Sequence, residues 1–170
     1  MPVLEDVKAN MERATGLRRP GKQQARDLAR VRRPYTVRFK DDGLAPNHPR
    51  WPFVIYRSAV DFGEGHDPAT VIEVLFESTG WRDSWRDGIY DYVHYHSRIH
   101  EVLGIARGRG RVRFGGNKGR IFTLEAGDVA ILPAGMGHQC LSADDDFLVV
   151  GAYPATGTYD ECEAIEDRPR

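Results

Sequence analysis

The stretch Gly88–Gly108, GIYDYVHYHSRIHEVLGIARG, carries the pattern that most constrains this chain. His94 and His96 are separated by one residue, and Glu101 follows five residues after His96. Side chains two residues apart on a β-strand project from the same face, so both imidazoles are expected on one face. Two imidazoles with a carboxylate close by can hold a divalent metal ion.

A fourth ligand candidate lies in GDVAILPAGMGHQCLS, where His138 follows a Gly-rich turn. Three nitrogens and one oxygen make a mixed donor set that suits one divalent ion of Fe, Mn, Ni, Co or Zn. A single histidine in an apolar setting is usually a hydrogen-bonded core residue. Here four of the six histidines fall in or beside the two segments, which favours a metal site over a coincidence.

The two segments resemble the paired motifs of the cupin superfamily. The matching positions are Gly88, His94, His96, Glu101 and Gly108 in the first segment, and Gly127, Pro133, Gly135 and His138 in the second. The resemblance implies an all-β fold with a single cupin barrel (a double-stranded β-helix or jelly roll). A few short helices are expected, mainly N-terminal and before the first motif. It also implies that the metal ligands are His94, His96, Glu101 and His138.

A narrower resemblance is to the YjlB-type group of small single-domain bacterial cupins, and it runs from about Tyr35 to Tyr159. The stretches that carry it are FKDDGLAPNHP, GWRDSWRDGIYDYVHYHS and FLVVGAYP. One position departs from the general cupin pattern, because Ser142 stands where a structural Asn often follows the last histidine. That change leaves the metal assignment intact.

The chain divides into three parts by pattern. Residues 1–34 form an N-terminal helical arm, with helical spacing from Val3 to Met11 and a polar helix at Lys22–Val31. Residues 35–153 form the barrel. Residues 154–170 are acidic, lack apolar periodicity and are expected to be a tail on the surface.

Within the barrel, Asp67 and Pro68 predict the start of a helix, which Gly80 ends. Short strands separated by turns are expected elsewhere. They are placed at Tyr35–Lys40, Phe53–Tyr56, Ile89–His96, His100–Arg107, Arg111–Phe114, Arg120–Leu124, Val129–Leu132, His138–Leu141 and Phe147–Tyr153. The repeat WRDS–WRDG places Trp81 and Trp85 four residues apart, and both indoles are expected to cover one end of the core.

Strand alternation also predicts the pocket. Tyr90 and Tyr92 share the expected face of the histidine pair, and Cys140 lies two residues after His138, so these three are the pocket-lining candidates. For each of them, filling the core is as good an explanation as contact with a ligand. His100 should point outward, because its neighbour Glu101 must point inward to bind a metal. The catalytic residues stay unassigned, although tyrosines are the best placed to move protons.

Charge and composition limit the classes of partner that this chain is expected to bind. The net charge of −1 gives no overall field for nucleic acid or membrane, although the first forty residues hold eleven Lys and Arg against four Asp and Glu. No apolar run reaches membrane-spanning length. Two cysteines are too few for a disulfide scaffold and fit a reducing cytoplasm. An exposed edge strand at Tyr35–Lys40 predicts a homodimer.

The leading functional hypothesis is a metal-dependent enzyme that acts on a small molecule, with dioxygenase-like oxidoreductase chemistry. Four protein ligands leave coordination positions open, as in catalytic metal sites. Two alternatives stay open, because a fold does not choose a reaction. One is a non-enzymatic module that binds a small molecule or a metal, and the other is a sugar isomerase or epimerase.

Overall fold

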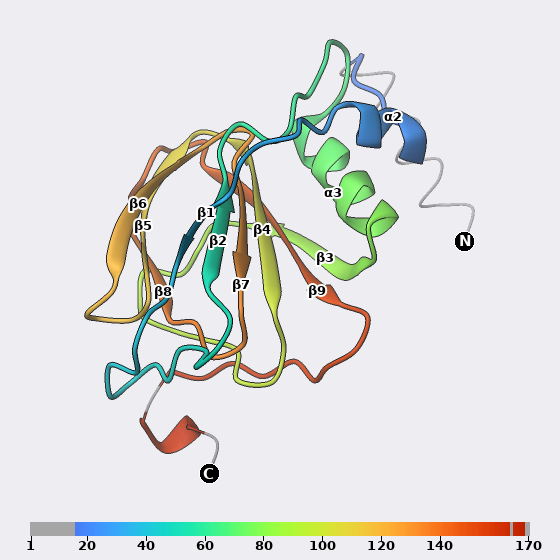
Figure 1. Cartoon of the computed structure of the whole chain (residues 1–170). Helices are drawn as coiled ribbons and strands as arrows, with labels where there is room; N and C mark the ends of the chain where they lie inside the picture. The colour runs from blue at the N-terminus through green and yellow to red at the C-terminus, as the bar shows by residue number, and fades with distance from the viewer. Residues whose placement is uncertain (1–15, 164, 169–170) are drawn as a thin grey trace, which may run out of the picture.

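The computed structural model describes residues 16–163 and 165–168, which form two antiparallel sheets packed face to face (Figure 1). The larger sheet has the order β1-β2-β7-β4-β9-β3 and the smaller one has the order β6-β5-β8. The strands are β1 (Tyr35–Val37), β2 (Phe53–Tyr56), β3 (Trp81–Asp87), β4 (Glu101–Arg107), β5 (Arg109–Phe114), β6 (Arg120–Glu125), β7 (Val129–Leu132), β8 (His138–Ala143) and β9 (Leu148–Pro154). The predicted jelly-roll barrel is confirmed.

In the part of the chain that the structure describes, three helices accompany the sheets: α2 (Lys22–Asp27), α3 (Pro68–Ser78) and the short 3-10 helix η1 (Ile165–Asp167). The expected helix from Val3 to Met11 lies outside the described residues. Helix α2 is shorter than the predicted Lys22–Val31 and packs against α3. The Arg26 guanidinium donates a hydrogen bond of 2.5 Å to the carbonyl of Ser78, so this part of the arm lies against its own chain.

Both faces of strand β4 are covered, one by the interior between the two sheets and the other by helix α3. Leu103 and Ile105 point into the space between the two sheets. Val102 and Ala106 point the other way, against α3. Gly104 lets the helix approach, since a Cβ there would come within 2.6 Å of the Ile72 side chain. The same alternation turns Glu101 inward, at the start of the strand.

The repeat WRDS–WRDG forms β3, which the sequence did not predict as a strand. A bulge between Arg82 and Trp85 places one extra residue on β3 relative to β9. The extra residue reverses the side-chain alternation, so Trp81 packs toward α3 while Trp85 points into the barrel. The expectation that both indoles cover one end of the core was therefore wrong.

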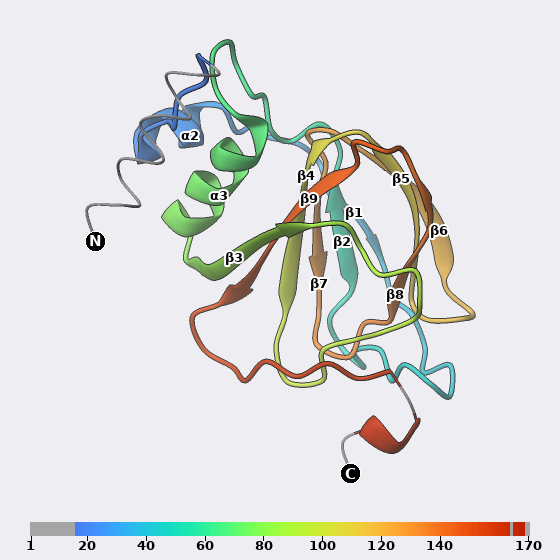
Figure 2. The same ribbon diagram turned by 180° about the vertical axis from the view of Figure 1, so that it is seen from behind.

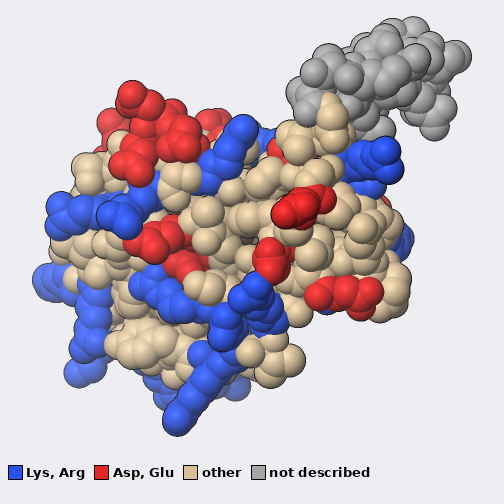
Figure 3. All heavy atoms as spheres, turned by 90° about the horizontal axis from the view of Figure 1, so that it is seen from above, with Lys and Arg blue, Asp and Glu red and all other residues tan. Residues whose placement is uncertain are grey.

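Figure 2 shows the chain after β9 running across the open end of the barrel, beside the connection that leads from β3 to β4. Viewed from above, Lys and Arg gather along the left and lower parts of this face, while Asp and Glu form a separate cluster at the upper left and smaller patches toward the centre and right (Figure 3). Within the described residues, no helix is long and apolar enough to cross a bilayer. Both cysteines are unpaired.

Helix α3 begins at a side-chain cap, and this cap gives a testable expectation. Asp67 accepts hydrogen bonds from the backbone N–H and the hydroxyl of Thr70, and pairs with Arg86 at 3.1 Å. Burial alone would raise the pKa of Asp67, but the Thr70 hydrogen bonds and the charge of Arg86 outweigh it and hold the pKa below its usual value. Asp67→Ala should therefore lower the free energy of unfolding by about 1 kcal/mol at neutral pH.

The pH dependence of that loss follows from the sign of the shift. A lowered pKa in the folded state stabilises the protein above the unfolded pKa of about 3.9, and the stabilisation fades as the pH falls through the folded value. Urea unfolding of both proteins should show the difference narrowing below about pH 4. Glu64→Ala, in the exposed loop before the cap, is the control and should change little. A difference that stays constant into acid would contradict the role of the carboxylate.

The edge strand β1 leads to a second expectation, about assembly. Among the residues that the structure describes, it pairs with β2 alone, so no described strand pairs with the backbone donors and acceptors of its other edge. Pairing with the same strand of a second copy would give a closed two-fold dimer. Light scattering of the full chain at micromolar concentration should report twice the monomer mass. A monomer mass under those conditions would rule this pairing out.

Candidate metal centre

The segment Gly88–His100, between β3 and β4, carries the first two candidate ligands. The expected strand at Ile89–His96 does not form, because its backbone bonds go to two different partners rather than to one ladder. His94 exchanges hydrogen bonds of 3.1 and 2.9 Å with the backbone of His138, the first residue of β8. The next residue, Tyr95, exchanges two bonds of 3.0 Å with Cys162 from beyond β9.

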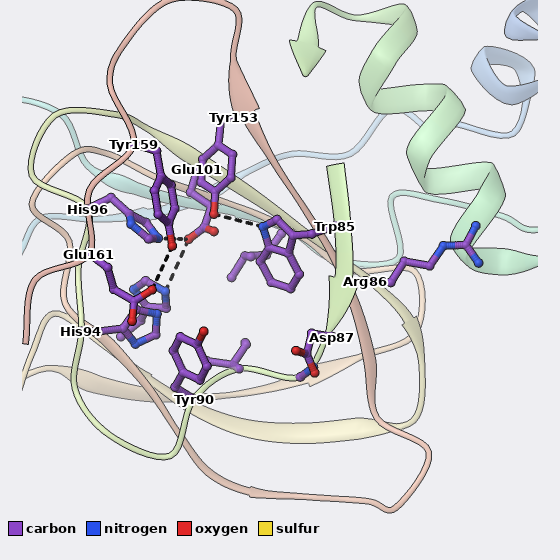
Figure 4. Close-up of a pocket in the computed structure, with 14 residues that line it drawn as sticks. Trp85, Arg86, Asp87, Tyr90, His94, His96, Glu101, Tyr153, Tyr159 and Glu161 are labelled. Carbon is purple, nitrogen blue, oxygen red and sulfur yellow. Dashed lines mark hydrogen bonds and ion pairs between the residues drawn. The ribbon is translucent and has the colours of Figure 1, made fainter. Parts of the chain in front are cut away.

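Three histidines converge at this point. One ring nitrogen from each of His94, His96 and His138 lies within 4.8 Å of the others. Their side chains are buried, with exposed fractions of 4%, 6% and 3%. The rings of His94 and His138 are 4.0 Å apart between centroids, which follows from the backbone bridge between the two residues. Figure 4 shows these side chains at one end of a cavity.

The Nδ1 atom of each of the three rings forms a hydrogen bond with a backbone carbonyl oxygen. The acceptors are the backbone carbonyls of Tyr92 for His94 at 3.4 Å, of Asp160 for His96, and of Met136 for His138 at 3.1 Å. A carbonyl oxygen only accepts, so Nδ1 must carry the proton in each neutral ring. The lone pair is then on Nε2, which is the arrangement found around histidines that ligate metals.

Glu101 supplies an oxygen on the same side. Its Oε2 lies 3.5 Å from the Nε2 atom of His96 and 3.4 Å from that of His138. The residue is 2% exposed, and Oε2 has no hydrogen-bond partner among the described residues. A buried carboxylate oxygen without a partner is costly. Two ligands at about 2.1 Å from one ion lie roughly 3.0–3.4 Å apart, so a shared cation fits this spacing and would satisfy the oxygen.

The electrostatics of the rings favour neutral imidazoles at two of the three positions. Burial, together with the charges of His94 and His96, holds the pKa of His138 well below its usual value. Burial also lowers the pKa of His94. At His96 burial acts in the same direction, but the Glu101 carboxylate, whose Oε2 lies 3.5 Å from Nε2, outweighs it, so this pKa is raised.

Beside the four side chains lies a cavity of about 230 Å³. Trp85 forms one wall, and its indole N–H donates a hydrogen bond of 3.1 Å to the hydroxyl of Tyr153. Gly151, opposite on β9, makes room for the indole, since a Cβ there would lie 2.1 Å from it. The cavity is lined by Trp85, Arg86, Asp87, Gly88, Ile89, Tyr90, His94, His96, Glu101, Leu103, His138, Tyr153, Tyr159 and Glu161.

Of the three pocket residues expected from the sequence, only Tyr90 is part of this lining. Tyr92 is outside the lining, but it stacks on Tyr90 with 4.9 Å between ring centroids, and its hydroxyl donates a hydrogen bond of 3.4 Å to Glu161. Cys140 is half-buried in β8, with its thiol 3.5 Å from the carbonyl of Ser142. His100 points outward as expected, and its Nδ1 accepts a hydrogen bond of 2.9 Å from the Ala134 N–H.

The sequence of this chain is similar to those of known proteins. The family model described as Cupin matches residues 86–157. The protein YjlB of Bacillus subtilis (strain 168), described as uncharacterized, is 42% identical over 126 residues, which cover 74% of this chain and 72% of that protein. The chain is a cupin. Its relationship to YjlB also confirms the narrower resemblance seen in the sequence.

Solved structures match this cupin more weakly. A structure of the DMSP lyases RdDddP and RnDddQII aligns over 48% of the chain and 40% of its own, with 21% identity and a TM-score of 0.38. A mutant of Bacillus subtilis oxalate decarboxylase OxdC aligns over 66% of the chain with 22% identity and a TM-score of 0.40. The cupin spans only 28% of that OxdC chain.

The segment after β9 takes part in the site, although the sequence analysis placed it in a surface tail. Tyr159 and Glu161 line the cavity, and Cys162 is buried. Asp160 holds the segment in place, because its carboxylate accepts hydrogen bonds from the backbone N–H and the hydroxyl of Ser97. Its carbonyl is the Nδ1 partner of His96. Two residues with apolar surface in an acidic stretch, Tyr159 and Cys162, were the only sequence signal for this role.

Proposed function

We propose that this cupin is a metal-dependent enzyme of the dioxygenase type, which binds one divalent transition metal ion and converts a small organic molecule. The proposed ligands are His94, His96, Glu101 and His138. The observation that carries the proposal is the buried Glu101 oxygen without a partner, facing the Nε2 atoms of two histidines at the closed end of a cavity. Four protein ligands beside an open cavity leave room for a substrate atom at the metal.

The donor set fits Fe, Mn, Ni, Co and Zn. A ferrous ion bound there would supply redox chemistry toward dioxygen, whereas zinc or nickel would supply Lewis acidity. The carbonyl partners of the three rings would keep the Nε2 atoms aimed at one point without any change in the histidines. This support from neighbouring groups is what orients ligands in functional metal sites.

The other residues of the cavity handle protons and exclude water. Burial raises the pKa values of Tyr153 and Tyr159, so both hydroxyls stay protonated and act as hydrogen-bond donors. Tyr159 donates to the carboxylate of Glu161 at 2.9 Å, which makes a hydroxyl–carboxylate pair at the mouth of the cavity. Trp85 and Leu103 give the inner wall its apolar surface, which keeps bulk water from the reacting end.

The decisive experiment has two steps. Elemental analysis of the purified protein, reloaded with each candidate metal in turn, should find about one metal ion per chain. Oxygen consumption by the ferrous protein is then measured against a panel of small organic substrates, with Glu101→Gln as the inactive control. Less than a tenth of an equivalent of every metal would overturn the metal site. Full metal content without turnover of any substrate would favour a binding module over an enzyme.

Metal retention should depend on pH. Ligating histidines must be neutral, so protons compete with the ion, first at His96, whose pKa is raised, and only at lower pH at His94 and His138, whose pKa values are lowered. Equilibrium dialysis against a series of buffers should show metal content falling as the pH drops through about 6, where imidazoles take up protons. A content that is unchanged well below that range would show that imidazoles are not the ligands.

A further inference from the structure

The charges that line the cavity indicate the kind of molecule that it accepts. Three carboxylates belong to the lining, those of Asp87, Glu101 and Glu161. A divalent ion would bring only two positive charges against them, so the lining keeps a negative balance with the metal in place. Glu161 stands at the mouth, where Figure 4 shows its carboxylate directed toward the hydroxyl of Tyr159 and the ring of His94.

Arg86 is the one cationic residue of the lining apart from the histidines, and its guanidinium is bound to residues of α3 and its cap. Its guanidinium forms two hydrogen bonds with Glu73, at 2.6 and 2.8 Å, and further bonds with Asp67 at 3.1 Å and with Thr70 at 2.8 Å. In Figure 4 its side chain runs away from the cavity toward α3. Among the described residues of the lining, no Lys or Arg is left to bind the carboxylate or phosphate of a ligand.

Aromatic side chains make up much of the remaining surface. Tyr90 and Tyr159 are exposed and border the opening, while Trp85 and Tyr153 lie deeper, with 5.3 Å between the ring centroids of Tyr153 and Tyr159. An organic cation is attracted to aromatic rings within about 6 Å, because their faces carry partial negative charge. Aromatic rings combined with carboxylates are the groups that recognise amines and methylated ammonium groups in proteins.

We propose that the cavity takes a small organic cation, a molecule with an amine or a methylated ammonium group. Its charged end lies between the Glu161 carboxylate and the aromatic rings at the mouth. Its other end reaches toward the four metal ligands, and in this respect the inference rests on the proposed function. The cavity selects its ligand by charge. The carboxylate at the mouth attracts a cation, and no Lys or Arg of the described lining is free to bind an anion.

The test compares two probes of nearly equal shape. Choline carries a trimethylammonium group, and in dimethylbutanol a carbon atom replaces the charged nitrogen. Binding is measured by calorimetry and by ligand-observed NMR, with the zinc-loaded and the metal-free protein. Choline should bind about tenfold more tightly than dimethylbutanol, and added salt should reduce that preference.

Matched variants assign the effect to the mouth. Glu161→Gln should weaken choline binding about fivefold or more and leave dimethylbutanol binding unchanged. Glu163→Gln, in the same exposed segment but outside the cavity lining, is the control and should behave as the parent protein. Tyr90→Leu removes one ring and should weaken choline binding by a smaller factor. Thermal unfolding of each variant confirms that it is folded.

The outcomes separate this inference from the proposed function. Equal affinity for the two probes, or the same choline affinity in Glu161→Gln and Glu163→Gln, overturns the cation site, whatever the metal content. Tighter binding of an anionic probe such as acetate to the metal-free protein also overturns it. A clear preference for choline in a protein that holds less than a tenth of an equivalent of metal supports the cation site and contradicts the metal-dependent function instead.

Discussion

Replacing His138 with alanine should lower the affinity for zinc by on the order of a hundredfold or more. Zinc sites with four protein ligands bind with about 10–16 kcal/mol, so the loss of one ligand removes a share equal to several powers of ten in the dissociation constant. His138 is the ligand with the firmest backbone support, because it exchanges two hydrogen bonds with His94 and begins β8. Competition with a chromophoric chelator measures the change directly.

Two controls accompany this substitution. His66→Ala removes a histidine in the loop before α3, far along the chain from both motifs, and should leave zinc affinity unchanged. Glu101→Gln keeps the size of the side chain but removes its charge, and it should also weaken zinc binding strongly. If His138→Ala folds normally by circular dichroism and retains the affinity of the parent protein, the proposed ligand set is wrong.

Phe53→Ala should have the largest effect on stability, a loss of about 3–5 kcal/mol in the free energy of unfolding. Phe53 is fully buried between the two sheets, with 4.4 Å between its ring centroid and that of Phe114 and 5.1 Å to that of Phe122. Alanine would leave a void in the core, which the surrounding strands can fill only in part. Chemical denaturation of the parent and the variant measures the difference.

Phe53→Leu serves as the comparison, because it keeps most of the apolar volume and should cost clearly less. The substitution also tests how the core supports the site. Phe114, the stacking partner of Phe53, lies nearly parallel to the ring of His138, with 6.4 Å between centroids. A loss below about 1 kcal/mol for Phe53→Ala would mean that this aromatic cluster does not hold the sheets together.

The parts of the fold that the sequence predicted are those with a local signal. Helix α3 starts at the Asp67–Pro68 pair and ends at Ser78, two residues before Gly80, as expected. Strands β2 and β7 have the predicted bounds, because their side chains alternate between buried and half-buried. The outward direction of His100 also followed from alternation, because its neighbour Glu101 begins β4 and is buried.

The parts that the sequence did not predict depend on partners far along the chain. Strand β3 was missed because its bulge breaks the period of two, and Asp83 in that bulge has a positive φ of 52°. Tyr92 was placed in the cavity on the assumption of a regular strand, which the segment Gly88–His100 does not form. The roles of Asp160 and Glu161 come from contacts with Ser97 and with the cavity, more than sixty residues away for Ser97.

The hydrogen bond between the Nδ1 atom of His96 and the backbone carbonyl of Asp160 couples the candidate metal centre to the segment after β9. Residues 159–162 follow β9, and the Tyr95–Cys162 bridge joins them to the barrel. An ion held by His96 and the docking of this segment therefore favour one another by the same free energy. If the proposed metal binds, an ion at His96 would help to hold the end of the described chain on the barrel, and its removal would loosen that end.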